Sequence, residues 1–237
     1  MRGLGTLINV VAIAAGTGVG LLVGPKVPER MRTTILQTVG LVVVVIGVTQ
    51  AAGSRNIVFP LVALVVGGIA GELLGLEERV DSLGERIRRR VERDSDPTAD
   101  PKQRSTFVEG FVAATLLYGV GPLAILGSID DGLRHDPQLL IVKAALDGLV
   151  SIVFASTLGW GVGFAAIPIL VYQGTLTLAA GAADRVLTTR MVIEMTAAGG
   201  VMVMGIGVRL LELKQIRVAS LLPALLLAPI GVALFAR

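Results

Sequence analysis

The chain has 237 residues, of which 53% are hydrophobic and 16% are charged, and its mean hydropathy is +0.78. A water-soluble domain with this composition would have too few polar side chains to cover its surface, so we predict a membrane protein. Cysteine is absent and histidine occurs once, which excludes disulfides, thiolate sites and multi-histidine metal centres. We therefore expect no cofactor. The net charge of +3 arises from cations beside apolar segments, so we expect no nucleic-acid partner.

Three apolar segments, 4–24, 34–52 and 57–76, have the length of about twenty residues that crosses a bilayer as a helix. The first contains Gly16 and Gly20, and this spacing of small residues lets a second helix approach closely. Residues 1–76 are therefore predicted to form a first membrane unit.

Residues 77–104 are rich in charge. Val80, Leu83, Ile87 and Val91 recur there at helical spacing, which predicts an amphipathic helix followed by a flexible linker rich in Asp and Pro. Most Lys and Arg residues outside the apolar segments fall on the same side as this loop. The positive-inside rule therefore predicts that residues 77–104 are cytoplasmic and that both termini are outside.

Residues 105–237 are predicted to form a second membrane unit. Its spans are expected at 107–129, twice within 139–183, at 191–211 and at 218–235, with a polar loop at 130–138 and a tight turn near 159–163. A re-entrant segment within 139–183 is the alternative. Gly119, Gly121 and Pro122 predict a break in the span 107–129. The predicted fold class is an all-α polytopic transmembrane bundle of about 7–8 spans with broken helices.

The second and seventh spans resemble each other. Gly40 and Gly47 match Gly200 and Gly207 in spacing, and both spans precede a short cationic turn and a helix with an early proline. Because the matching helices cross in opposite directions under this topology, we predict an inverted repeat, an architecture in which secondary transporters place a site between the halves. A chance match between two low-complexity apolar segments is the alternative.

Lys143 and Asp147 carry charge within a predicted span, where one charge costs roughly 2.5 to 3.5 kcal/mol. They are four residues apart, so they share a helix face and are expected to pair. If the pair has a function, it would be a gate or a proton-coupling pair, or part of a lining that attracts anions and excludes cations. The structural alternative is a salt bridge that only fixes helix packing.

We predict an ion or solute path through a midplane site made of polar groups in the spans and of the break. Its candidate residues are Asn9, Gly121, Pro122, Ser128, Lys143, Asp147, Tyr172, Gln173 and Glu194. A helix that begins near Leu123 would offer free amides to an anion, whereas the carbonyls before the break would suit a cation. Both alternatives are open at this point.

The chain is not expected to be an enzyme. Ser128, Asp130, Asp131 and His135 lie close together in sequence, but no GxSxG nucleophile elbow surrounds the serine. A Walker motif is also absent from the sequence, which argues against an ATP-driven pump.

Six motifs carry a family resemblance: GTLINVVAI at Gly5, GELLGLE at Gly71, GPLAILGSIDDGL at Gly121, KAALDGLVSIVFAST at Lys143, YQGTLTL at Tyr172 and EMTAAGG at Glu194. With these motifs the chain resembles the YqgA/YdfK family, a domain of unknown function in bacterial inner-membrane proteins. The resemblance implies a multi-pass protein of the bacterial inner membrane and implies no substrate. The segment 77–104 carries none of the motifs.

Two functions follow from these observations. The first is a transporter or channel for a small ion or polar solute. The alternative is a non-transporting scaffold whose intramembrane charges serve packing alone. The expected partners are the lipid bilayer, a small ion or solute, and further copies of the chain in a homo-oligomer.

Overall fold

The fold is that of a computed structural model, which describes residues 2–91 and 101–235. Within these residues the secondary structure is helical and contains no strand. The first part of the chain forms α1 (Leu4–Val23), η1 (Gly24–Lys26), α2 (Glu29–Ala52), α3 (Val58–Leu73) and α4 (Leu76–Val91). The second part forms α5 (Pro101–Gly119), α6 (Pro122–Leu133), α7 (Gln138–Leu158), α8 (Gly161–Phe164), α9 (Ala166–Leu178), α10 (Ala180–Val186), α11 (Thr189–Leu210), η2 (Ala219–Leu221) and α12 (Ala224–Phe235).

These helices are long and apolar enough to form a membrane bundle. Among the described residues, five helices can cross a bilayer, or up to seven if each of two bent helix pairs is one span, and 219–235 is a shorter apolar helix. One bent pair joins α3 to α4 at 66°, and the other joins α5 to α6 at 60°. The predicted all-α transmembrane fold with broken helices is confirmed.

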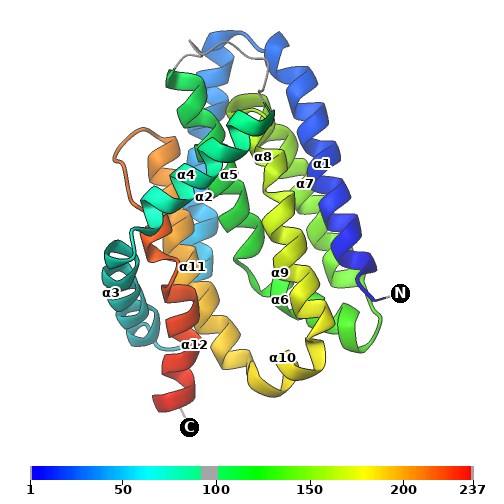
Figure 1. The fold of residues 1–237 in the computed structure, drawn as a ribbon, viewed down its shortest axis with the longest axis vertical. Helices are drawn as coiled ribbons and strands as arrows, with labels where there is room; N and C mark the ends of the chain where they lie inside the picture. Colours follow the sequence, from blue (N-terminus) through cyan, green and yellow to red (C-terminus); the bar gives the residue numbers. More distant parts are fainter. Residues whose placement is uncertain (1, 92–100, 236–237) are drawn as a thin grey trace.

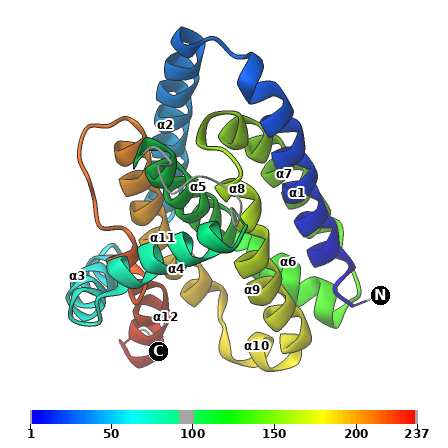
Figure 2. The same ribbon diagram turned by 45° about the horizontal axis from the view of Figure 1, so that its top comes forward.

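Each helix of the first predicted unit packs against a helix of the second. The main neighbours are α1 with α7, α2 with α11, and α3 with α12. Figure 1 shows α1 and α7 side by side at one edge of the bundle and α3 beside α12 at the other, with both termini in the lower half of the view. Figure 2 shows α5 between these two sides. The bundle is therefore built mainly from contacts between residues that are far apart in the sequence.

Glycine allows the closest of these approaches. A Cβ atom added to Gly16 in α1 would lie 2.2 Å from the carbonyl oxygen of Gly148 in α7. In the α2–α11 pair, a Cβ on Gly47 would lie 2.6 Å from the carbonyl oxygen of Gly200. A Cβ on Gly71 of α3 would lie 1.9 Å from the carbonyl oxygen of Ser220. These small residues allow the backbones to come into contact inside a membrane, where hydrophobic burial does not drive helices together.

The variant Gly16→Ala is expected to lower the free energy of unfolding by about 1–3 kcal/mol, because the new methyl group must push α1 away from α7. Gly18→Ala is the matched control on the same helix, since a Cβ there would meet no atom within 4 Å. The control should be neutral or stabilising by up to about 1 kcal/mol, because alanine favours helix over glycine. Equilibrium unfolding in mixed detergent micelles, followed by circular dichroism, measures both. Equal effects of the two variants would contradict the close approach as the cause.

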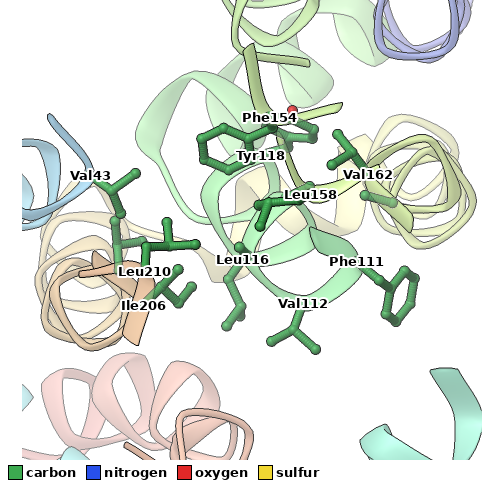
Figure 3. Close-up of a cluster of buried hydrophobic side chains, with 14 of the residues drawn as sticks. Val43, Phe111, Val112, Leu116, Tyr118, Phe154, Leu158, Val162, Ile206 and Leu210 are labelled. Carbon is green, nitrogen blue, oxygen red and sulfur yellow. The ribbon is translucent and has the colours of Figure 1, made fainter. Parts of the chain in front are cut away.

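The main apolar core surrounds α5. Leu116 of α5 lies between Val43, Ile206 and Leu210 on one side and Leu158 on the other (Figure 3). The N-terminal part of α5 has a separate aromatic contact. The ring centroid of Trp160 lies 4.3 Å from that of Phe107 and 5.2 Å from that of Phe164. This aromatic group fixes the turn between α7 and α9 against α5.

A charged network lies where α3 meets α4. The Glu77 carboxylate accepts a hydrogen bond from the Arg209 side chain at 3.1 Å and bonds from the backbone N–H groups of Ala219 and Ser220 at 2.8 and 3.3 Å. Arg217 pairs with Glu72 at 2.5 Å and also contacts the Glu78 carboxylate. The start of α4 is therefore attached to the turn between α11 and α12.

Several segment boundaries differ from prediction. The second helix, α2, begins at Glu29 instead of residue 34, and α5 begins at Pro101, within the predicted linker. The loop expected at 130–138 is helical up to Leu133, because Asp130 and Asp131 continue the last turns of α6. The third span ends at Leu73, earlier than expected, where Gly75 adopts a left-handed conformation (φ 60°) that turns the chain into α4. The amphipathic helix predicted after residue 77 is present as α4. The part of the predicted linker at 92–100 lies outside the described residues.

Candidate functional site

Lys143 and Asp147 form a buried ion pair in α7. The Lys143 ammonium donates to the Asp147 carboxylate, and the two residues are only 6% and 7% exposed. The predicted pairing on one helix face is therefore present. A buried pair of this kind is electrically neutral as a unit, but each partner alone would be an uncompensated charge inside the bundle.

Two amides from other helices lie beside this pair. Asn9 of α1 donates from Nδ2 to Oε1 of Gln173 in α9 at 3.3 Å, and both residues are fully buried. The Asn9 side chain also interacts with the Asp147 carboxylate. Three helices, α1, α7 and α9, therefore contribute to one group, which we call the polar cluster: Asn9, Lys143, Asp147 and Gln173.

The aromatic residue Tyr118 of α5 joins the polar cluster from another side. Its ring centroid lies 5.9 Å from the Lys143 ammonium, a distance compatible with a cation–π contact. Its hydroxyl shares a hydrogen bond of 2.8 Å with the Ser151 hydroxyl, one helical turn after Asp147 in α7. The Lys143 ammonium therefore has a carboxylate and an aromatic face as neighbours.

Several buried polar atoms near this group have no hydrogen-bond partner among the described residues. In the polar cluster these are Asn9 Oδ1 and Gln173 Nε2. One turn away on the same two helices, the hydroxyls of Thr6 and Thr177 are also buried and unpartnered. Buried polar groups in proteins are normally satisfied by protein or water. An unpartnered acceptor and an unpartnered donor on two side chains that contact each other can instead bind a small polar solute, an ion or water.

Asp131 lies at the end of this row of polar residues. It is completely buried, and its Oδ2 accepts a bond of 3.1 Å from the backbone N–H of Gly5, at the start of α1. A carboxylate at a helix N-terminus is stabilised by the free amides there. Its second oxygen, Oδ1, has no partner within the described part of the chain.

The break between α5 and α6 is the second feature of the site. Gly121 is extended (φ 160°, ψ 150°), and Pro122 is the first residue of α6. The carbonyl oxygen of Val120 accepts a bond of 3.3 Å from Nε2 of Gln50 in α2. No side chain caps the N-terminus of α6. The Val120 carbonyl thus has a donor from α2, Pro122 has no N–H to donate, and the N–H of Ala124 donates to the carbonyl of Gly121 at 3.2 Å.

A cavity of about 320 Å³ lies next to this break. Its walls come from α5, α6, α9, α11 and α12, and they are mainly apolar, with Ile125, Ile169 and Met195 among them. The polar groups in the lining are Thr115, Tyr172, Thr196 and the backbone at Gly121. A second space of about 630 Å³ lies between α9 and Leu83 of α4, and it is lined by apolar residues apart from Tyr172 and Thr175.

The polar cluster and the cavity lie next to each other along two helices. Tyr118 contacts the polar cluster and its neighbour Gly119 lines the cavity, both on α5. On α9, Gln173 belongs to the polar cluster and its neighbour Tyr172 lines the cavity. The predicted single site is therefore two adjacent features that share α5 and α9.

Comparison with known proteins identifies the family of this chain. A family model described as a protein of unknown function (DUF554) matches residues 4–233. The chain belongs to the DUF554 family. This match confirms the resemblance read from the motifs, and it extends from the start of α1 into α12.

Two relatives of this DUF554 protein have similar length. It is 29% identical over 230 residues to the "Uncharacterized membrane protein YdfK" of Bacillus subtilis (strain 168), covering 95% of this chain and 94% of the relative. It is 30% identical over 225 residues to the "Uncharacterized protein YqgA" of Escherichia coli (strain K12), again covering 95% and 94%. No solved structure gives a significant match.

Two predicted site residues lie apart from both features in this DUF554 member. Glu194 of α11 is buried, and its carboxylate accepts bonds from the Ser54 hydroxyl at 2.5 Å and from the backbone N–H groups of Arg55 and Asn56 at 2.9 and 3.1 Å. It therefore binds the turn between α2 and α3. The Ser128 hydroxyl donates to the carbonyl of Ala124 in its own helix at 2.6 Å.

The remaining predicted residues are brought together as two groups. Asn9, Lys143, Asp147 and Gln173 form the polar cluster, while Gly121, Pro122 and Tyr172 lie at the break and the cavity. Sequence reasoning missed Tyr118, Ser151, Asp131 and Gln50. For Ser151 a signal existed, since it continues the spacing of four from Lys143 and Asp147 along one helix face.

The described residues offer no evident metal centre. No group of three or more His, Asp or Glu side chains is arranged to hold a metal ion there. The groups that the site presents to a ligand are one ion pair, amides and hydroxyls.

Proposed function

We propose that this protein transports a small ion or polar solute across the bacterial inner membrane, with the polar cluster on its path. The observation that carries the proposal is the combination of a buried ion pair with the unpartnered Asn9 Oδ1 and Gln173 Nε2 in a membrane bundle. Ionisable residues inside spans normally pair with each other and mark ion or substrate pathways. A packing role alone gives no reason for the two unpartnered amide atoms.

The glycine contacts between α2 and α11 support the predicted inverted repeat. Gly40 lies against Gly207, and Gly47 lies against Gly200. In the sequence match, Gly40 corresponds to Gly200 and Gly47 corresponds to Gly207. The match therefore converts one contact into the other, as expected for two halves that are related by a two-fold axis. A site between such halves is typical of secondary transporters. We also propose that residues 77–104 are cytoplasmic and that the protein has no enzymatic activity.

Flux into sealed proteoliposomes tests the proposal across a panel of protons, cations, inorganic anions and small organic solutes. The decisive variant is Lys143→Met with Asp147→Asn, because it removes both charges and leaves neither partner unpaired. We expect wild-type protein to give selective flux and this double variant to lose it. The matched control is Arg134→Met with Asp130→Asn, a more exposed pair with the same spacing at the end of α6. It should retain flux.

Two outcomes would contradict the proposal. One is the absence of flux for every solute with wild-type protein that unfolds as a single cooperative species. The other is unchanged flux in the double variant, which would assign Lys143 and Asp147 to packing, as in a scaffold protein.

A further inference from the structure

We propose that Asp131, Thr6 and Thr177 form a binding site for a small monovalent cation, Na⁺. The site lies at the end of the row of buried polar residues, one helical turn from Asn9 and Gln173 of the polar cluster. Its three residues come from α6, α1 and α9. The position of this ion on a path rests on the proposed transport function, whereas its binding does not.

Asp131 is a buried carboxylate without a counter-ion. It is 0% exposed, and no Lys, Arg or His forms an ion pair with it among the described side chains. Its Oδ2 accepts the bond from the Gly5 N–H, and its Oδ1 has no partner there. Ionised groups inside proteins are normally paired or bound to a metal ion. A cation at Oδ1 would supply the missing charge.

Consecutive residues of α6 bring the ends of two other helices to this carboxylate. Because Gly5 donates to Asp131, Thr6 is the next residue of α1 beside it. Gly132 is in contact with α9, since an added Cβ would lie 2.3 Å from the Thr177 carbonyl oxygen. The start of α1 and the end of α9 therefore meet at Asp131 and Gly132.

Thr6 and Thr177 lie on the facing sides of α1 and α9. The bond between Asn9 and Gln173 marks these sides. Thr6 is three residues before Asn9 and shares its helix face. Thr177 is four residues after Gln173 and shares that face of α9. Figure 1 shows that α1 rises from the N-terminus whereas α9 descends to α10, so both steps lead toward the same end of the bundle. The two threonines are therefore at the level of Asp131.

The hydroxyl oxygens of both threonines are free to bind a ligand. Thr6 and Thr177 are each 2% exposed, and neither hydroxyl has a hydrogen-bond partner among the described residues. The Thr38 and Thr49 hydroxyls of α2 instead donate to the carbonyl one turn earlier, at 2.8 and 2.9 Å. Buried polar groups normally have a partner, and a cation would provide one for both hydroxyl oxygens and for Asp131.

Two helix ends favour positive charge at this place. The helix α6 ends at Leu133, two residues after Asp131, and α9 ends at Leu178, one residue after Thr177. Helix C-termini carry partial negative charge. The C-terminal ends of discontinuous helices coordinate Na⁺ or H⁺ in secondary transporters, and α6 is discontinuous because it begins at the break. The N-terminus of α1 has the opposite sign, but its Gly5 amide is bonded to Oδ2 and leaves Oδ1 free.

The ligand atoms decide the kind of ion. Carboxylate and hydroxyl oxygens suit hard cations. One carboxylate and a monovalent ion form a neutral unit, whereas a divalent ion would keep a net charge inside the bundle. The described residues also contain no group of three or more His, Asp or Glu side chains that could hold a metal ion. Because α6 and α9 are in backbone contact at Gly132, the site suits Na⁺ better than the larger K⁺.

Equilibrium binding of radioactive Na⁺ to the purified full-length protein in detergent micelles, measured by scintillation proximity, tests the site without requiring transport. Choline chloride keeps the ionic strength constant. We expect saturable binding that unlabelled Na⁺ displaces at least about tenfold more effectively than K⁺. The absence of saturable Na⁺ binding, or equal displacement by the two ions, would overturn the proposal.

Three variants locate the bound ion. Asp131→Asn removes the charge but keeps an acceptor oxygen for the Gly5 N–H, so the protein should fold and lose Na⁺ binding. Thr6→Val and Thr177→Val keep the shape of the side chain, and each should weaken Na⁺ binding by at least about tenfold. Binding that persists in Asp131→Asn, or unchanged affinity in both threonine variants, would overturn the assignment to this site.

Each kind of variant has a matched control. Asp130→Asn changes the adjacent carboxylate, which is partly exposed and paired with Arg134. Thr17→Val removes a buried, unpartnered hydroxyl elsewhere on α1. Both controls should bind Na⁺ with wild-type affinity. Loss of binding in both controls would overturn the assignment, because the effect would then not depend on the position of the changed group.

The failure of the site and the failure of the transport function give different results. Na⁺ binding that depends on Asp131, without flux of any solute, would support the site and contradict transport. Selective flux that is independent of Na⁺, with no Na⁺ binding, would support transport and contradict this ion.

Discussion

Lys143→Met is expected to lower the free energy of unfolding by about 3–5 kcal/mol, because it leaves the Asp147 carboxylate buried without its counter-ion. The remaining neighbour, Asn9, is neutral and already bonded to Gln173. Asp147→Asn should have a similar cost, because it leaves the Lys143 ammonium without a counter-ion, with the neutral asparagine amide and the Tyr118 ring as neighbours. Unfolding in mixed detergent micelles, followed by the helical circular dichroism signal, measures both variants.

The double variant separates charge compensation from packing. Lys143→Met with Asp147→Asn should recover most of the lost stability, because replacing a buried ion pair as a whole is often neutral. Arg134→Met is the control in a more exposed pair of the same spacing, 75% exposed at the Arg134 side chain, and should cost less than about 1 kcal/mol. If the double variant were as unstable as the single variants together, the two side chains would act independently and the ion pair would not be the cause.

Glu194→Ala is expected to cost about 2–4 kcal/mol, since three donors lose a charged acceptor and the partly exposed turn recovers some of these bonds with water. The donors are the Ser54 hydroxyl and the backbone N–H groups of Arg55 and Asn56. The loss should free the turn between α2 and α3 from α11. The same unfolding measurement gives the magnitude.

Two further variants place Glu194 in a structural or a transport role. Ser54→Ala keeps the carboxylate and removes one of its three donors, so it should cost about 1 kcal/mol. Glu194→Gln keeps the size of the side chain and one acceptor oxygen. If Glu194 only holds the turn, Glu194→Gln lowers stability and leaves flux unchanged. Loss of flux with wild-type stability would indicate instead that Glu194 lies on the transport path.

The lengths of the apolar segments and the Gly and Pro residues that interrupt them were sufficient to predict most of the helices. About twenty apolar residues in a row have few alternatives to a membrane helix, and Gly121 followed by Pro122 cannot continue the helix of α5. Pairing of Lys143 with Asp147 follows from helix geometry alone. The end of α6 was predicted too early, because two consecutive aspartates resemble a loop in sequence, whereas buried Asp131 lies against the first turn of α1.

The arrangement of the site could not be predicted, because it depends on which spans are neighbours. Asn9 and Gln173 are separated by 164 positions in the sequence, and no local pattern connects them. Gln50 and Val120 are separated by 70 positions, so the sequence also did not indicate which side chain donates to the carbonyl at the break. Tyr172 and Gln173 are adjacent in sequence but belong to the cavity and to the polar cluster, because successive helical residues point in different directions.

The contact of Trp160 with Phe107 and Phe164 gives the protein an internal optical reporter. Trp160 is the single tryptophan of the chain, so its ultraviolet emission originates from this one position. It lies where α5 meets the turn before α9, and these are the two helices that the polar cluster and the cavity share. A ligand that displaces either helix would change the emission of the unlabelled protein, and its occupancy could be followed in real time without a substitution or an attached dye.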